Sequence, residues 1–209
     1  MFFWFLVTCI MTNRKEKIGL YSGSFNPIHI GHLILANYIV ENTDLDKIWF
    51  VLSPQNPLKK QTDLLADDIR YDMMKKAVED NSNFIASDVE LFLPKPSYTI
   101  NTLNYLSKQY TQNEFSLIMG EDNLANIDKW KDYQKILSLY NIYVYPRENC
   151  QANQYYDYSK VHLLKAPLLN ISASYIREQI KKGKSIQYLV PQIVKKAIEE
   201  KELYKSATK

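Results

Sequence analysis

Short apolar runs and amphipathic segments alternate along the whole chain. The apolar run 18–21 predicts a buried strand, and the periodic segment 33–40 that follows it predicts a helix. The same pattern predicts further strands at residues 46–53, 84–89, 115–119, 141–145 and 161–164. Further helices are predicted at residues 69–78, 99–110, 174–182 and 192–204, and in a segment that carries Trp130 and ends at Leu139.

Strictly alternating strands and helices are typical of a parallel sheet that helices cover on both faces. We therefore predict an α/β fold, a Rossmann-like doubly wound parallel sheet with a C-terminal helical segment. No repeat, low-complexity tract or linker divides the chain, so residues 17–209 are expected to form a single domain. Ligands of such sheets bind beyond the carboxyl ends of the strands, where the strand order reverses.

The composition narrows the class of protein to a globular one. Of the 209 residues, 46% are hydrophobic and 23% are charged, which excludes a disordered chain and an integral membrane protein. The net charge of +3 suits a small anionic ligand, and without a long Lys/Arg run it gives no reason to expect nucleic acid. Cys9 and Cys150 lack the spacing of a metal site or a disulfide framework, so we expect a cytoplasmic location.

The status of residues 1–16 is open. The apolar run 1–11 is about half the ~20 residues that cross a bilayer, and it lacks the features of a secretory signal. We expect Met11 to be the natural start, with residues 1–10 arising from an upstream start assignment. A weak membrane-surface anchor is the alternative.

The rarest residue types gather in residues 19–33, Gly-Leu-Tyr-Ser-Gly-Ser-Phe-Asn-Pro-Ile-His-Ile-Gly-His-Leu. This stretch holds three of the five glycines and two of the three histidines, His29 and His32. A strand that enters a glycine-containing loop opening a helix brings unpaired N–H groups and a partial positive charge to one point. The stretch therefore predicts a phosphate-binding loop, with both histidines facing one ligand.

A structural role or a zinc-binding role suits this histidine pair less well. A lone histidine usually has a structural role, and we assign that role to His162 in its predicted strand. A pair around a glycine at a helix N-terminus favours function instead. Zinc binding would need a third ligand near the two histidines, and the sequence offers none. The two standard nucleotide-binding motifs, G-x-x-x-x-G-K-[ST] and G-x-G-x-x-G, are also absent from the sequence.

Two segments resemble the signatures of the nucleotidyltransferase superfamily. Residues 23–32, Gly-Ser-Phe-Asn-Pro-Ile-His-Ile-Gly-His, resemble G-x-F-D-P-x-H-x-G-H, and residues 171–177, Ile-Ser-Ala-Ser-Tyr-Ile-Arg, resemble I-S-S-T-x-I-R. Over residues 17–204 the chain is similar to the bacterial nicotinate-nucleotide adenylyltransferases. The similarity to this family is supported by residues 56–59, Arg70, residues 97–99, and residues 119–124 with Trp130. The chain departs from the two signatures at Asn26, where Asp is commoner, at Ile28, where Pro is commoner, and at Ala173-Ser174 in place of Ser-Thr.

The resemblance implies transfer of the AMP unit of ATP to the 5′-phosphate of nicotinate mononucleotide, giving deamido-NAD and pyrophosphate in NAD biosynthesis. It implies Mg²⁺ bound through the ATP phosphates, with no direct protein ligand. The implied catalytic residues are His29, His32 and Arg177. The implied ATP site comprises Gly23, Ser24, Phe25, His29, Gly31, His32, Asp122, Ile171, Ser172, Ser174 and Arg177, and the implied nicotinate-nucleotide site comprises Asn56, Lys59, Thr99 and Trp130.

The reaction itself explains the lack of an acid–base pair. A phosphate with a second pKa near 6 is largely ionised at neutral pH, so it needs no general base. We therefore expect the two histidines to stabilise charge. Each of several other residues has a structural alternative: Ser174 as the N-cap of its helix, Trp130 as core, Lys59 as solvated surface and Arg70 as a weak surface ion pair.

Several functional alternatives stay open. Phosphopantetheine adenylyltransferases and cytidylyltransferases are usually shorter and lack the 119–130 segment, and a non-catalytic nucleotide-sensing module is a further alternative. Class I aminoacyl-tRNA synthetases share H-x-G-H, but this chain has no K-M-S-K-S element and no room for a tRNA-binding domain. The sequence does not determine the oligomeric state, for which a homo-oligomer is one option. It also does not determine the preference for nicotinate over nicotinamide mononucleotide, or whether a lid closes over the site.

Overall fold

The computed structural model describes residues 14–54, 64–148, 150 and 153–205. Met11, Cys9, Asn56 and Lys59 lie outside the described residues, as does the leader except for residues 14–16. No helix among the described residues is long and apolar enough to cross a membrane.

The strands form one parallel sheet. In chain order they are β1 (Glu16–Gly23), β2 (Lys47–Leu52), β3 (Phe84–Ser87), β4 (Asn113–Gly120), β5 (Ile142–Tyr145) and β6 (Val161–Leu163). Their order across the sheet is β3-β2-β1-β4-β5-β6, with every neighbouring pair parallel. The predicted Rossmann-like fold is therefore confirmed, and the strand order reverses between β1 and β4.

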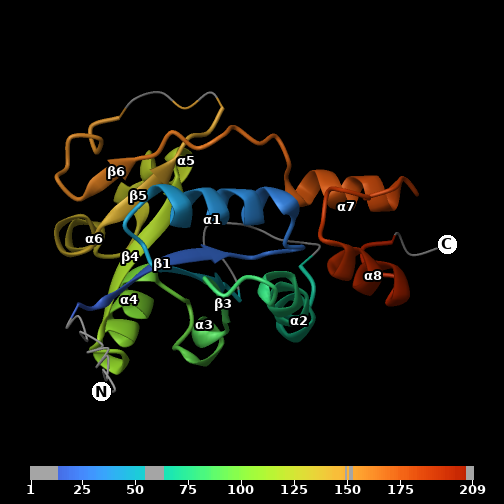
Figure 1. The fold of residues 1–209 in the computed structure, drawn as a ribbon, viewed down its shortest axis with the longest axis horizontal. Coiled ribbons are helices and arrows are strands. Elements are labelled where there is room, and N and C mark those ends of the chain that lie inside the picture. The colour runs from blue at the N-terminus through green and yellow to red at the C-terminus, as the bar shows by residue number, and fades with distance from the viewer. Residues whose placement is uncertain (1–13, 55–63, 149, 151–152, 206–209) are drawn as a thin grey trace, which may run out of the picture.

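Helices cover both faces of this sheet (Figure 1). Those that contribute to the core of one face are α1 (Ile30–Asn42), α2 (Asp67–Val78), α7 (Ala173–Lys181) and α8 (Gln192–Glu200). Those of the other face are α4 (Thr99–Gln109), α5 (Glu121–Leu124), the 3-10 helix η1 (Ile127–Lys129) and α6 (Tyr133–Leu139). The short α3 (Val89–Phe92), which the sequence analysis did not predict, follows β3.

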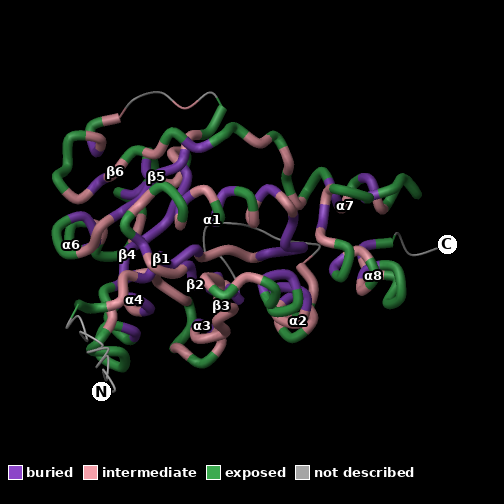
Figure 2. The backbone as a smooth tube through the Cα atoms, in the orientation of Figure 1, coloured by how far each residue is buried: buried purple, intermediate pink, exposed green. Residues whose placement is uncertain are grey.

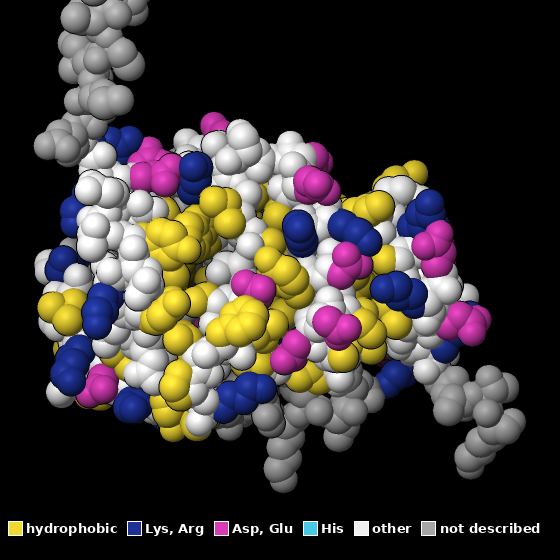
Figure 3. All heavy atoms as spheres, turned by 90° about the horizontal axis from the view of Figure 1, so that it is seen from below, with side chains coloured by type: hydrophobic (Ala, Val, Ile, Leu, Met, Phe, Trp, Pro, Cys, Tyr) yellow, Lys and Arg dark blue, Asp and Glu magenta, His cyan; other side chains and the backbone are white. Residues whose placement is uncertain are grey.

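The strands alternate their side chains between the two cores. In β1, for example, Ile18 and Leu20 pack on the α4 side while Tyr21 packs on the α1 side. Because both faces are covered, the central strands β1, β2, β4 and β5 are largely buried (Figure 2), whereas the edge strands β3 and β6 are only partly buried. In the view from below, Lys/Arg and Asp/Glu side chains are interspersed with hydrophobic ones, and no histidine side chain is visible (Figure 3).

Several local predictions are wrong. The helix predicted at residues 192–204 ends at Glu200, and the strand predicted at residues 84–89 ends at Ser87. The segment around Trp130 is not one helix, because α5 and η1 end before Trp130 and α6 begins only at Tyr133. The break is fixed by Asp132, whose φ of 53° is left-handed and cannot continue a helix. The N-cap of α7 is Ser172 rather than Ser174, since the Ser172 hydroxyl accepts a hydrogen bond from the Tyr175 N–H at 3.2 Å.

Arg70 is not a surface ion pair. Its side chain is fully buried on α2, and its guanidinium donates hydrogen bonds to four backbone carbonyls, those of Ser24, Ser53, Pro54 and Leu65. The carboxylate of Asp67, one turn away, balances the charge. Arg70 thus ties the loop after β1 to the chain that leaves β2 and to the chain that enters α2.

We expect Arg70→Met to lower the free energy of unfolding by at least ~3 kcal/mol, because four carbonyls that are at least partly buried lose their donor together. Urea denaturation measures this loss. Lys76→Met on the same helix removes only the exposed pair with Asp72 and should change stability by less than ~0.5 kcal/mol. Similar small losses in both variants would contradict the role of Arg70.

Candidate functional site

A cavity of about 820 Å³ opens at the carboxyl ends of β1, β4 and β5, where the strand order reverses. Its walls come from four parts of the chain that are far apart in the sequence: residues 21–35, 122–123, 145–148 with Cys150, and 167–177. The N-termini of α1 and α7 both lie at this cavity. Two helix N-termini at one cavity are suited to a ligand that carries several negative charges.

Every residue predicted for the ATP site lines this one cavity. The set comprises Gly23, Ser24, Phe25, His29, Gly31, His32, Asp122, Ile171, Ser172, Ser174 and Arg177. The fold thus brings the two sequence signatures together across 139 positions of sequence, from 32 to 171. Their contacts with ATP stay predictions.

His29 and His32 stack on each other. Their ring centroids lie 3.6 Å apart with an interplanar angle of 22°. His29 is the N-cap residue of α1, and its backbone N–H donates to Nδ1 of His32 at 3.2 Å. Because Nδ1 of His32 is an acceptor, a neutral His32 carries its proton on Nε2.

Burial at the cavity wall favours neutral imidazoles. Burial, and secondarily the charge of Arg147, lowers the pKa of His29 from 6.5 to about 4. Burial also lowers the pKa of His32, with the charges of His29 and Arg147 adding to the effect. Nδ1 of His29 is buried and has no hydrogen-bond partner in the described structure. A buried polar atom without a partner is costly, so this nitrogen is a candidate ligand contact.

Gly31 keeps the histidine pair in place. A Cβ atom at this position would lie 3.1 Å from Nδ1 of His29, tighter than ordinary packing, and 3.6 Å from Cβ of Ile171. The contact with Ile171 is ordinary packing, but a side chain at this position would need the His29 ring to shift by a few tenths of an ångström. Close packing against His29 therefore favours glycine in the H-x-G-H sequence.

The second signature faces the first directly. Nη1 of Arg177 donates to the backbone carbonyl of Asn26 at 2.8 Å, while its buried Nε has no hydrogen-bond partner in the described structure. The hydroxyls of Ser172 and Ser174 lie 3.1 Å apart at the start of α7. The α7 N-terminus thus offers hydroxyl, backbone and guanidinium donors to the same cavity.

The sequence analysis missed Tyr145 and Arg147. The Arg147 guanidinium lies over the Tyr145 ring, 4.9 Å from its centroid, and Nη2 donates to the Tyr145 hydroxyl at 3.1 Å. Arg147 also lies 3.6 Å from the carboxylate of Asp122. The signal was present, because Arg147 follows the end of a predicted strand and so falls at the ligand edge of the sheet.

Two of the residues predicted for the nicotinate nucleotide, Thr99 and Trp130, lie outside the cavity. Thr99 opens α4, and Trp130 packs partly buried against the core of that face. The ammonium of Lys131 lies 4.8 Å from the ring centroid of Tyr98, so the two segments meet. Their role in binding stays a prediction, and Asn56 and Lys59 are outside the described residues.

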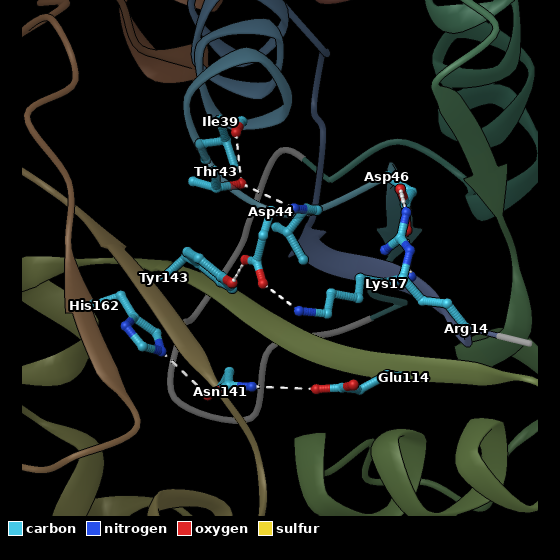
Figure 4. Close-up of polar contacts among 11 residues, drawn as sticks. Arg14, Lys17, Ile39, Thr43, Asp44, Asp46, Glu114, Asn141, Tyr143 and His162 are labelled. Carbon is cyan, nitrogen blue, oxygen red and sulfur yellow. Dashed lines mark hydrogen bonds and ion pairs between the residues drawn. The ribbon is translucent and has the colours of Figure 1, made fainter. Parts of the chain in front are cut away.

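His162 lies on the outer strand β6, beside the amino ends of the strands and thus on the opposite side of the sheet from the cavity. Nε2 lies 3.1 Å from Oδ1 of Asn141, whose amide donates to Glu114 at 3.3 Å (Figure 4). Nearby, the hydroxyl of the buried Tyr143 donates to Asp44, which also pairs with Lys17.

We find no group of three or more His, Cys, Asp or Glu side chains arranged for a metal in the described part of the chain.

We expect the His29 ring in the ligand-free protein to titrate near pH 4, because burial disfavours the imidazolium. An NMR pH titration of the ring proton signals measures this directly. The free energy of unfolding should therefore fall as the pH is lowered, because the unfolded chain takes up a proton at His29 near pH 6.5 and the folded protein does so only near pH 4. The contribution of His29 to stability is thus complete above pH 6.5 and is lost as the pH falls to 4. A midpoint near 6.5 would contradict the buried, neutral state.

Comparison with known proteins agrees with this geometry. A family model described as cytidylyltransferase-like matches residues 20–179. A Flavobacterium psychrophilum protein named "Probable nicotinate-nucleotide adenylyltransferase" is 51% identical over 191 residues, which cover 90% of this chain and 99% of the relative. A Cytophaga hutchinsonii protein of the same name is 50% identical over 188 residues, covering 90% and 98%.

Among solved structures, Plasmodium falciparum nicotinic acid mononucleotide adenylyltransferase complexed with NaAD has the same fold. The superposition has a TM-score of 0.75 at 20% sequence identity, and it covers 90% of this chain and 97% of the Plasmodium falciparum chain. The chain therefore belongs to the cytidylyltransferase-like family and, within it, to the nicotinate-nucleotide adenylyltransferases.

Proposed function

We propose that this protein transfers AMP from ATP to the 5′-phosphate of nicotinate mononucleotide, producing deamido-NAD and pyrophosphate. The observation that carries the proposal is that both signature segments, each at a helix N-terminus, face one cavity of about 820 Å³. The name shared by relatives that are about half identical over 90% of the chain supports the choice of substrates. A location in the cytoplasm suits the free thiol of Cys150 at the cavity wall.

The chemistry is an in-line displacement at the α-phosphorus of ATP. An oxygen of the nicotinate mononucleotide phosphate forms the new P–O bond, and the bond between the α-phosphorus and the bridging oxygen breaks. The bridging oxygen takes the electron pair and leaves with pyrophosphate. The nucleophile is already ionised at neutral pH, so no side chain has to remove a proton.

The main barrier is repulsion between two polyanions. Two unit charges ~4 Å apart interact by about 4 kcal/mol at an effective dielectric near 20. Positive charge, hydrogen-bond donors and alignment must offset this repulsion. At the cavity, Arg147 and Arg177 supply the positive charge, and the N-termini of α1 and α7 supply oriented N–H groups.

His29 and His32 act on the phosphates as hydrogen-bond donors. Neutral His32 presents its Nε2–H, while Nδ1 of His29 is the buried atom without a partner in the described structure. A bound triphosphate would raise the pKa of both rings, because negative charge favours the imidazolium. The pair therefore stabilises charge that develops on the leaving pyrophosphate.

The pyridine nucleotide would bind on the α4 side, beside the meeting point of the Tyr98 and Lys131 segments. There we assign Thr99 to the nicotinate carboxylate and Trp130 to stacking on the ring. Asn56 and Lys59 would contact the rest of the nucleotide. Selectivity for nicotinate over nicotinamide mononucleotide would then depend on hydrogen-bond donors at the N-terminus of α4, which would bind the nicotinate carboxylate.

Mg²⁺ would enter with the nucleotide. The polar side chains at the cavity are hydroxyls, amides, imidazoles, guanidinium groups, the Cys150 thiol and the carboxylates of Asp122 and Glu148. Most of these groups donate hydrogen bonds, so the set fits phosphate oxygens better than a bare divalent cation. When bound, the ion would offset part of the negative charge of the phosphates and stabilise the pyrophosphate that leaves. Asp122 lies close enough to the cavity to contact the nucleotide or water around the ion.

The decisive experiment offers purified protein ATP and Mg²⁺ with nicotinate mononucleotide, nicotinamide mononucleotide or phosphopantetheine. We expect pyrophosphate release to be fastest with nicotinate mononucleotide, and deamido-NAD to be identified by mass. Release with phosphopantetheine alone would move the protein to another activity of the superfamily. Release with none of the three would refute the enzymatic proposal.

We expect His32→Ala to lower kcat by ~100-fold, the typical cost of one lost transition-state donor. His162→Ala is the matched control, because His162 lies at the opposite edge of the sheet. Steady-state kinetics with saturating substrates separates the two. An unchanged kcat in His32→Ala would remove this residue from the mechanism.

A further inference from the structure

Asn26 joins three distant parts of the chain. It is buried in the loop between β1 and α1, and its side-chain oxygen accepts hydrogen bonds from the Tyr204 hydroxyl at 2.8 Å and from the Leu65 N–H at 3.4 Å. Its backbone carbonyl accepts from Arg177 at 2.8 Å. One residue of the phosphate-binding loop therefore contacts the entry to α2, the second signature and the C-terminal segment.

Tyr204 reaches this position at a conformational cost. Its φ of 62° lies in the left-handed region, which bulky residues seldom adopt, yet its side chain is only 8% exposed. Phe25, directly before Asn26, has a φ of 41° and is also buried. Backbone strain of this kind persists only where the surrounding structure holds it, and it is frequent at functional sites.

We propose that Tyr204 is a positioning residue of the ATP site, acting through the side chain of Asn26. Asn26 lines the cavity and Tyr204 does not, so Tyr204 would not touch the substrates. Its hydroxyl orients the Asn26 side chain, and this fixes the loop that presents His29 and the carbonyl that binds Arg177. The inference rests on the proposed function and extends it to a residue outside both signatures.

The geometry favours this role over simple packing of the C-terminus. The ring of Tyr204 already belongs to the hydrophobic core with Val194 and Ile198 of α8. The hydroxyl adds a direct bond to a cavity residue 178 positions earlier in the chain. Packing alone needs the ring, whereas positioning needs the hydroxyl, so the two roles separate on removal of a single oxygen.

Tyr204→Phe removes that oxygen and keeps the ring. Tyr143→Phe is the matched control, because Tyr143 is equally buried and its hydroxyl also donates to a side-chain oxygen, that of Asp44, at the opposite edge of the sheet (Figure 4). We expect both variants to lose stability in thermal unfolding. Only Tyr204→Phe should lower kcat/KM for ATP, by about tenfold, with KM for nicotinate mononucleotide within about twofold.

A double-mutant cycle with Asn26→Ala tests the route. If Tyr204 acts through Asn26, its substitution has no further effect on kcat/KM for ATP in the Asn26→Ala background. Independent, additive effects would overturn the proposal, as would a Tyr204→Phe variant that loses stability and keeps the kinetic constants of the wild type. If Tyr204→Phe does not fold, the Asn26→Ala single variant carries the test, and an unaltered kcat/KM for ATP in that variant overturns the proposal. An inactive wild-type protein would instead refute the proposed function and this assignment with it.

Discussion

The buried guanidinium of Arg70 solves a problem that the sheet creates at its ligand edge. Where parallel strands end, the chain must turn away, and its carbonyl groups no longer pair within the sheet. Four such carbonyls converge on Arg70, from the loop after β1, the end of β2 and the entry to α2. A planar cation with five donors fits this arrangement better than an ammonium group could. The loop that carries the histidine pair depends on it.

Much of the fold could be predicted because its signals are local. Each strand is a short apolar run and most helices have a clear apolar face, so six strands and their alternation with helices follow from periodicity. The failures were also local in origin. Asp132 interrupts the Trp130 segment through a left-handed φ, and Ser172 rather than Ser174 caps α7, a choice between two serines that spacing alone cannot make.

The candidate site divides in the same way. The residues within the two signatures could be predicted from the sequence, and the fold brings them around one cavity. Arg147 could have been placed at the ligand edge from its position just after a predicted strand. Arg70 and Tyr204 could not be assigned, because their surroundings are set by chain segments far away. Arg70 stands among acids in the sequence, which suggested an exposed pair, but burial depends on the loop carbonyls that surround it. Charge pattern carries no information about such three-dimensional neighbours.

The contacts of Asn26 also bear on how the protein forms during synthesis. Chains emerge from the ribosome N-terminus first, and domains fold as units. The loop that carries His29 is made early, but its partners Arg177 and Tyr204 follow 151 and 178 residues later. A nascent chain that ends before them has all six sheet strands but lacks the wall of the cavity that residues 167–177 supply. The cavity is therefore completed only when the chain is nearly complete.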